Sequence, residues 1–376
     1  MKQTKILSGL FGAVFILASV LRAQDQDEVA GGKVDPVALT QLAERGSAEA
    51  QFELGIRLLS GEGLDKDEKQ AAEWLKKAAA QQSLPAMNAL GSMSEEGVGL
   101  PKDPKKAFEW YEKSAKFGFA LAQLNLADCY DMGKGVEKDE KQAFSWVSRA
   151  AQQDFAPAQA AYGWKLEHAV GTEKKTHEAA SWYLKAAQQG LVAAMTRLAY
   201  LYYTGSGVPL DYHRAEAWYS LAARSDDPWA HNDLAWFLAT CPDESFHDPE
   251  TALEFARSAA GKLSDNRYEA IDTLAATLAR SGKFGEAIQT EQKAIVRFSE
   301  DKSKTITPEE RVKLEKELLD RLSLYKKQRP YTEKKPEPDA GTKPMVEDRI
   351  LQDVELPRRN KKNPGKKGSD EPAAIS

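Results

Sequence analysis

The chain has 376 residues, of which 42% are hydrophobic and 29% are charged, a composition typical of a soluble folded protein rather than a disordered or multi-span one. Its 52 basic and 57 acidic residues give a net charge of −5, which argues against a nucleic-acid-binding protein. Two cysteines exclude a disulfide-dense scaffold or a cysteine-rich zinc module, and five histidines leave little material for a histidine metal centre.

Residues 1–23 are typical of an export signal. Lys2 and Lys5 precede an apolar run over residues 6–21, which at ~1.5 Å per residue spans about 24 Å, less than the ~30 Å hydrocarbon core of a membrane. A short apolar run after a basic start predicts a signal peptide, with Ala23 as its last residue. We therefore expect an exported protein, periplasmic or secreted, without a transmembrane domain in its mature form. An uncleaved N-terminal anchor is the alternative.

A period of 36 residues runs through the middle of the chain. One alanine position recurs in register, at Ala50, Ala86, Ala122, Ala158 and Ala194. A glycine position recurs at Gly63, Gly99, Gly135, Gly171 and Gly207, and a tryptophan position at Trp74, Trp110, Trp146, Trp182 and Trp218. Five tryptophans at one spacing indicate a repeat architecture.

Each repeat is predicted to be a helical hairpin. In the last full unit Ala194, Leu198 and Tyr202 share one helix face, and the glycine-rich "TGSGV" follows as a turn. Asp211 is then a candidate N-cap for a second helix that presents Trp218. A hairpin of this kind cannot bury its apolar face alone, so neighbours must stack. The pattern predicts an all-α fold, a right-handed superhelical solenoid of helix-turn-helix repeats.

These residues resemble the Sel-one-like repeat family, a relative of the tetratricopeptide repeats. The alanine–leucine–glycine first helix, the paired-glycine turn, the aspartate cap and the alanine–tryptophan second helix carry the resemblance over five units. The fourth unit departs from the pattern, because Ala169 replaces the first glycine and Lys175 replaces the cap, so that Thr176 is the alternative cap. The resemblance implies protein–protein interaction rather than enzymatic activity.

Helical signals continue on both sides of the repeats. Asp35-Pro36 starts a short helix, and the stretch from Ala270 to Ile295 looks like a tetratricopeptide unit. Thr307 and Glu310 predict a capping box. The predicted division is a signal peptide 1–23, a linker 24–34, an N-terminal capping helix 35–46, five Sel-one-like repeats 47–226, two tetratricopeptide-like repeats 227–301, a C-terminal capping helix 302–329 and a disordered tail 330–376.

No catalytic, metal or cofactor site is predicted. His177 and His213 lie one period apart, but no third ligand accompanies them. Cys241 and His247 share a loop without an oxyanion motif or an orienting partner. Cys129 and Cys241 are three units apart along the stack, beyond the reach of a disulfide.

Two stripes on the first helices predict where a partner would bind. One of them ends in three aromatic residues, Trp164, Tyr200 and Trp236, which is typical of a binding hot spot. Carboxylates one turn further along the first helices, in the middle of the row, favour a ligand that carries Lys or Arg. We expect Asn88 and Asn232 to bond a ligand backbone. The predicted partner-binding residues are Phe52, Ile56, Asn88, Leu124, Asp128, Trp164, Tyr200, Tyr203, Asn232 and Trp236. The alternative is that the aromatic side chains merely pack between units.

The sequence therefore predicts a non-enzymatic scaffold or adaptor outside the cytoplasm, which binds a protein or peptide in the concave groove. One alternative is a cell-envelope hydrolase or β-lactam-interacting enzyme, although the paired cysteines of family members linked to β-lactam binding are missing. Another is an envelope-polymer binder that uses the basic run at 357–368, which holds six positive charges and no negative ones. The oligomeric state stays open.

Overall fold

The computed structural model describes residues 35–263, 267–302, 306–339, 342 and 345, and the regular elements within these ranges are all helices. The predicted signal peptide and linker, and the basic run of the tail, lie outside the described residues. The chain divides into two compact units, one that runs to Ala215 and includes 336–348, and one made of 216–335 with 349–376. We call them unit 1 and unit 2. None of the helices in the described ranges has the length and hydropathy required to cross a bilayer.

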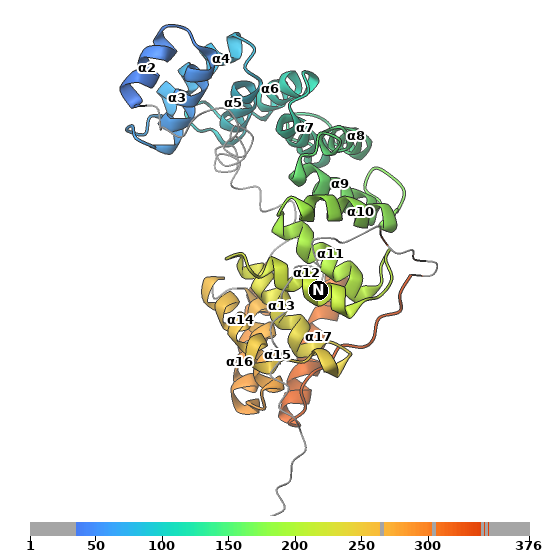
Figure 1. The fold of residues 1–376 in the computed structure, drawn as a ribbon. Coiled ribbons are helices and arrows are strands. Elements are labelled where there is room, and N and C mark those ends of the chain that lie inside the picture. Colours follow the sequence, from blue (N-terminus) through green and yellow to red (C-terminus); the bar gives the residue numbers. More distant parts are fainter. Residues whose placement is uncertain (1–34, 264–266, 303–305, 340–341, 343–344, 346–376) are drawn as a thin grey trace, which may run out of the picture. The chain divides into compact units, whose positions relative to one another are not determined.

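Unit 1 is a row of helical hairpins, visible as successive pairs in Figure 1. Within residues 36–204 each helix packs against the next along the chain, which confirms the predicted all-α repeat fold. The row begins with α2 (Pro36–Glu44). The first helices of the hairpins are α3 (Ala48–Ser60), α5 (Leu84–Glu96), α7 (Ala120–Met132), α9 (Ala156–His168) and α11 (Val192–Thr204). The second helices are α4 (Glu68–Ala80), α6 (Pro104–Lys116), α8 (Glu140–Ala151) and α10 (Thr176–Gln188), and α12 (Tyr212–Ala222) follows across the division between the units.

The repeated alanines let the helices approach closely, and all but Ala50 of the five in register are fully buried. A glycine in the first helix serves the same purpose where a bulky ring faces it. At Gly91 an added Cβ would lie 2.5 Å from the Tyr111 ring, and at Gly163 it would lie 3.1 Å from the Tyr183 ring. Both tyrosines are fully buried, so the small residue on one helix and the ring on the other fix the packing of each hairpin.

The paired-glycine turn sets the distance between neighbouring repeats. Gly133 ends α7 with a φ of 69°, and Gly135 follows with a φ of 72°, both in the left-handed region. A Cβ on Gly135 would lie only 2.1 Å from the carbonyl oxygen of Pro104, where the second helix of the previous repeat starts. The turn therefore needs glycine for its backbone conformation and for its contact with the repeat before it.

Aspartate caps begin the second helices as predicted. Asp67, Asp103 and Asp139 each accept hydrogen bonds from two backbone N–H groups of the following turn. The fourth unit differs, because Lys175 is the N-cap and donates or accepts no capping bond through its side chain. The expectation that Thr176 caps this helix is wrong, since Thr176 is the first residue of α10 and is buried. The helix forms without a cap because tertiary packing of its alanine face stabilises it.

Unit 2 contains two further hairpins and a long last helix. The first hairpin is α13 (Pro228–Thr240) with α14 (Pro249–Lys262), joined through a short 3₁₀ turn, η2 (Glu244–Phe246). The second is α15 (Tyr268–Arg280) with α16 (Phe284–Glu300), and α17 (Pro308–Lys326) packs on α16. The capping box predicted for α17 is present, with reciprocal bonds between Thr307 and Glu310.

After α17 the chain continues as a drawn-out stretch without regular secondary structure (Figure 1). Residues 331–339 belong to the region that the sequence assigns to a tail, and they make specific hydrogen bonds. We call them the return segment. Within unit 1, the Asp339 carboxylate accepts a bond of 2.9 Å from the backbone N–H of Gly207, and the Asp339 N–H donates to the Gly205 carbonyl. Within unit 2, Tyr331, Thr332 and Glu333 contact the helices.

Candidate partner-binding surface

Four of the predicted partner-binding residues lie half-exposed on the first helices of unit 1. They are Phe52, Asp128, Trp164 and Tyr200. The Trp164 ring stacks on His168 with 4.6 Å between ring centroids, and the Arg197 guanidinium lies 4.9 Å from the centre of the Tyr200 ring. Both aromatic rings are thus oriented by a neighbour on their own helix while part of each stays accessible. We call Asp128, Trp164 and Tyr200, which lie one repeat apart, the first-helix stripe.

The other six predicted residues are buried. They are Ile56, Asn88, Leu124, Tyr203, Asn232 and Trp236. The Asn88 side chain accepts a hydrogen bond of 2.9 Å from Asn125 of the next repeat, so its amide joins neighbouring first helices. The Trp236 indole in unit 2 donates a hydrogen bond to Glu333 of the return segment. These six side chains therefore contact other residues of the chain, whereas the sequence predicts that they contact a ligand.

The carboxylates in the middle of the predicted groove are paired within the chain. Glu95 lies 2.7 Å from Lys134, Asp131 lies 2.7 Å from Lys165, and Glu167 pairs with Arg197. Each partner comes from the following repeat. Burial opposes the charge of Lys134, but hydrogen bonds to Asp128 and Glu95 outweigh it and raise the pKa of this ammonium group. The acidic row therefore neutralises cations of the protein itself.

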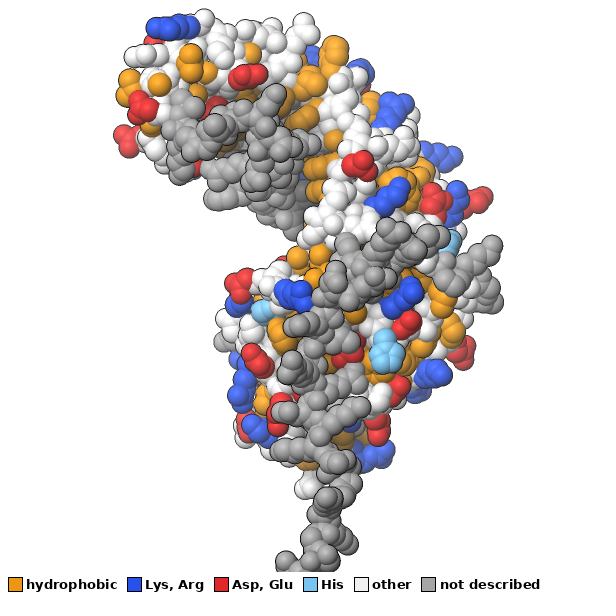
Figure 2. Space-filling view, viewed as in Figure 1, with side chains coloured by type: hydrophobic (Ala, Val, Ile, Leu, Met, Phe, Trp, Pro, Cys, Tyr) orange, Lys and Arg blue, Asp and Glu red, His pale blue; other side chains and the backbone are white. Residues whose placement is uncertain are grey.

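Two sets of bridges between helices went unnoticed in the sequence. Tyrosines of the second helices reach first-helix carboxylates of the same hairpin, Tyr111 to Glu95 at 3.0 Å and Tyr183 to Glu167 at 2.9 Å. Glutamine pairs 30 residues apart recur at 2.8 Å, between Gln51 and Gln81, Gln123 and Gln153, and Gln159 and Gln189. The constant spacing of 30 residues between these glutamines is the pattern in the sequence that could have predicted the pairs. Acidic and basic side chains are also interspersed on the face that Figure 2 shows.

Unit 2 contains a buried arginine that contacts two aromatic rings. The Arg321 guanidinium lies 5.5 Å from the centre of the Trp236 ring and 5.4 Å from that of the Tyr331 ring. Asp272 holds it through two hydrogen bonds of 2.8 and 2.9 Å. The arrangement joins α13, α15, α17 and the return segment.

The model of the Sel1 repeat matches five consecutive segments, 48–83, 84–118, 120–155, 156–191 and 192–227. The chain is a Sel1-like repeat protein. The crystal structure of a Sel1 repeat protein from Oxalobacter formigenes is 25% identical, with a TM-score of 0.55 over 68% of this chain and 98% of that one. No curated protein sequence matches this chain.

A second structure is a protective antigen of uropathogenic Escherichia coli strains that displays an SLR fold. It is 28% identical, with a TM-score of 0.46 over 71% of this chain and 66% of that one. Repeats of the Sel1 and tetratricopeptide type generally mediate protein–protein interaction.

The thiols and histidines considered as catalytic groups lie in packed surroundings in this Sel1-like repeat protein. Burial raises the pKa of both Cys129 and Cys241 to about 12, so each stays a protonated thiol at neutral pH. The His247 Nε2 lies 2.8 Å from the backbone oxygen of Cys241, and the His177 Nδ1 lies 2.9 Å from that of Gly207. Within the described residues, no three His, Cys, Asp or Glu side chains gather into a metal site.

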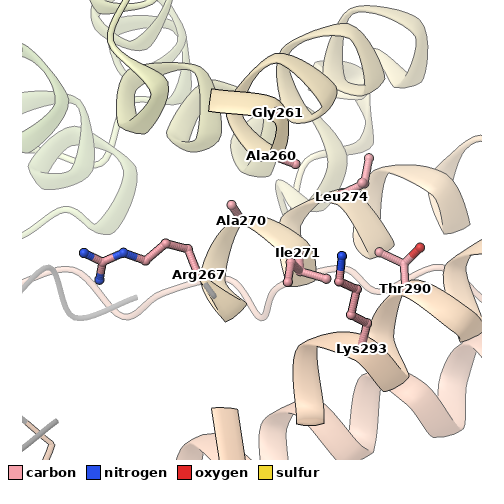
Figure 3. A pocket seen from close by; sticks show the side chains of 8 residues that line it. All are labelled: Ala260, Gly261, Arg267, Ala270, Ile271, Leu274, Thr290 and Lys293. Atoms are coloured by element: carbon pink, nitrogen blue, oxygen red, sulfur yellow. The ribbon is translucent and has the colours of Figure 1, made fainter. Parts of the chain in front are cut away.

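A small hollow of about 300 Å³ lies among α14, α15 and α16 of unit 2 (Figure 3). In this view Lys293 extends towards Ile271 and Leu274, whereas Arg267 projects away from them. Its walls are Ala260, Gly261, Arg267, Ala270, Ile271, Leu274, Thr290 and Lys293. None of these is a predicted partner-binding residue, so the hollow is separate from the first-helix stripe.

We expect the buried carboxyl group of Glu291 to make the stability of unit 2 depend on pH. Its side chain is fully buried, 3.8 Å from the Nε of Arg321, which Asp272 already pairs. Burial, followed by the charge of Asp272, raises the pKa of the Glu291 carboxyl to about 10 from its usual 4.5. Between these values the folded state keeps a proton that the unfolded state has lost, so stability falls as pH rises, by up to about 1.4 kcal/mol per pH unit.

We expect Glu291→Gln to remove this slope and to stabilise unit 2 more at pH 8.5 than at pH 5.5. Urea unfolding at the two pH values measures it. Glu315→Gln, on the exposed side of α17, is the control and should keep the wild-type slope. Equal slopes for wild type and Glu291→Gln would show that Glu291 is ionised in the folded chain.

Proposed function

We propose that this protein is a non-enzymatic scaffold or adaptor that binds a partner polypeptide on the first-helix stripe of unit 1, outside the cytoplasm. The half-exposure of Trp164 and Tyr200 carries the proposal, because side chains at other positions of the same helices, such as Leu166 and Leu198, are fully buried. Trp and Tyr supply large contact areas with few rotatable bonds. The basic start and short apolar run of residues 1–23 support export.

The proposed contact is mainly apolar. The stripe's one carboxylate, Asp128, already lies 2.8 Å from Lys134, and the neighbouring Glu95, Asp131 and Glu167 are paired as well. A partner rich in Lys or Arg would have to displace cations of the protein itself. We therefore do not extend the proposal to a basic partner, and we expect binding to depend weakly on salt.

Crosslinking capture from a cell-envelope extract tests the proposal. Trp164→Ala with Tyr200→Ala should lower the recovery of the crosslinked partner about tenfold, as expected for the loss of two hot-spot rings. The far-UV circular dichroism should stay nearly unchanged, because neither ring is part of the fully buried core.

The matched control is Trp110→Ala with Phe117→Ala. It removes one ring from the second helix α6 and one from the C-cap of that helix, where Phe117 is 68% exposed. It should leave the recovery of the partner unchanged. Equal recovery from both double variants would contradict the proposed surface. Loss of the helical signal in the first variant would assign its two rings to the core.

A further inference from the structure

The first three residues of the return segment, Tyr331–Glu333, lie against the helices of unit 2 in the manner of a bound peptide. The Glu333 N–H donates to the Thr240 carbonyl at 2.8 Å. The Arg280 Nη2 donates to the Tyr331 carbonyl at 2.6 Å and to the Thr332 hydroxyl at 2.7 Å. The extended stretch Tyr331–Glu333 is thus bound through the main-chain carbonyl of its first residue and the main-chain N–H of its last. Bonds to these two groups select the backbone conformation of the stretch.

Side chains at the two ends of this stretch enter specific contacts. The Glu333 carboxylate accepts a bond of 2.8 Å from the Trp236 indole N–H. The Tyr331 ring lies 6.0 Å from the Trp236 ring and packs against the apolar cluster that includes Leu278 and Tyr325. The site therefore distinguishes an aromatic residue followed two positions later by a carboxylate.

The helices themselves hold the recognising groups in place. Arg280 donates through Nε to the Ala239 carbonyl at 2.7 Å, which leaves Nη2 directed at the segment. Asp272 fixes Arg321 beneath the two aromatic rings through both of its oxygens. These contacts of Arg280 and Arg321 do not involve the return segment, so the helices themselves position both guanidinium groups, which lowers the cost of ordering a ligand. We call Trp236, Thr240, Arg280 and Arg321 the unit 2 site.

We propose that the unit 2 site binds a partner's extended segment in which an aromatic residue precedes a carboxylate by two positions, and that Tyr331–Glu333 fill it in the free protein. This inference rests on the proposed function and names the class of segment that the scaffold would recognise. The return segment is tethered directly after α17, so it competes at an effective concentration on the order of 1 mM. A partner's segment must therefore bind the unit 2 site more strongly than the tethered segment does, or bind after that segment has been displaced.

Fluorescence polarisation with a fluorescein-labelled peptide of residues 329–338 tests this in the full chain. The double variant Tyr331→Ala with Glu333→Ala removes the side-chain contacts of the tethered segment, so it should bind the peptide at least about tenfold more tightly than wild type does. Trp236→Phe added to this variant should weaken binding about tenfold, because the carboxylate loses its donor. A peptide with E333K should not bind.

Lys334→Ala with Lys335→Ala is the matched control, since both lysines are exposed in the same segment. It should bind the peptide no better than wild type. Equal binding by wild type and the Tyr331/Glu333 variant, or binding by neither, would overturn the inference. If the peptide fails while partner capture still depends on Trp164 and Tyr200, the scaffold function stands and only this site is wrong. If partner capture does not depend on Trp164 and Tyr200 but the peptide binds tightly, the unit 2 site stands and the proposed first-helix stripe is wrong.

Discussion

Gly135→Ala should destabilise unit 1 by about 3 kcal/mol or more. A left-handed backbone costs a residue with a Cβ about 1–2 kcal/mol, and overpacking adds about 1–3 kcal/mol. The φ of Gly135 is 72°, and the new methyl would lie 2.1 Å from the Pro104 carbonyl oxygen. Neither atom can move aside cheaply, because the oxygen belongs to the backbone of one repeat and the methyl carbon is bonded directly to the backbone of the next. Urea unfolding followed by circular dichroism at 222 nm measures the loss.

Gly118→Ala separates the two causes. Gly118 also has a positive φ, 95°, but a Cβ there would meet nothing within 4 Å. It should cost about 1–2 kcal/mol, the conformational part alone. Similar losses for the two variants would mean that the repeats are not packed through the second glycine of the turn.

Arg197→Met should destabilise unit 1 by about 3–5 kcal/mol, because it leaves a buried carboxylate without its cation. Arg197 and Glu167 are 7% and 9% exposed, and the Tyr183 hydroxyl completes the group. The effect should be local to α9, α10 and α11. Urea unfolding gives the total loss, and hydrogen exchange of these helices locates it.

A compensating change tests the cause. Glu167→Gln together with Arg197→Met removes both charges and keeps an acceptor for Tyr183, so most of the lost stability should return. Lys76→Met breaks an exposed pair with Glu73 and should cost less than about 1 kcal/mol. A double variant as unstable as Arg197→Met would show that the stem of Arg197, rather than the charge of Glu167, is responsible.

The sequence predicts the repeat fold well because its signals are local. Asp67, Asp103 and Asp139 cap their helices through bonds to residues two or three positions away, and the glycine pairs recur every 36 residues. Cap chemistry and periodicity act over short distances, so they can be recognised without coordinates. The failure at Thr176 has the same origin, because nothing local shows that packing alone would start that helix.

The candidate surface was less predictable, because the same period describes both the core and the exposed stripe. Whether Asn88 faces a ligand or Asn125 depends on the rotation of one helix against the next, which the repeat does not specify. The pairing of Glu95 with Lys134 could have been inferred from opposite charges in adjacent repeats. The unit 2 site could not, because it brings together Trp236 and Arg321, 85 positions apart, with a segment that has a tail-like composition.

Hydroxyl-radical footprinting of the full chain, with and without its captured partner, tests most directly whether the first helices bind a polypeptide. We expect the partner to slow the oxidation of Trp164 and Tyr200, while Trp110 and Phe117 react at the same rate in both states. Protection of Trp110 and Phe117 with unchanged oxidation of Trp164 and Tyr200 would place the partner on the second helices and contradict binding to the first-helix stripe.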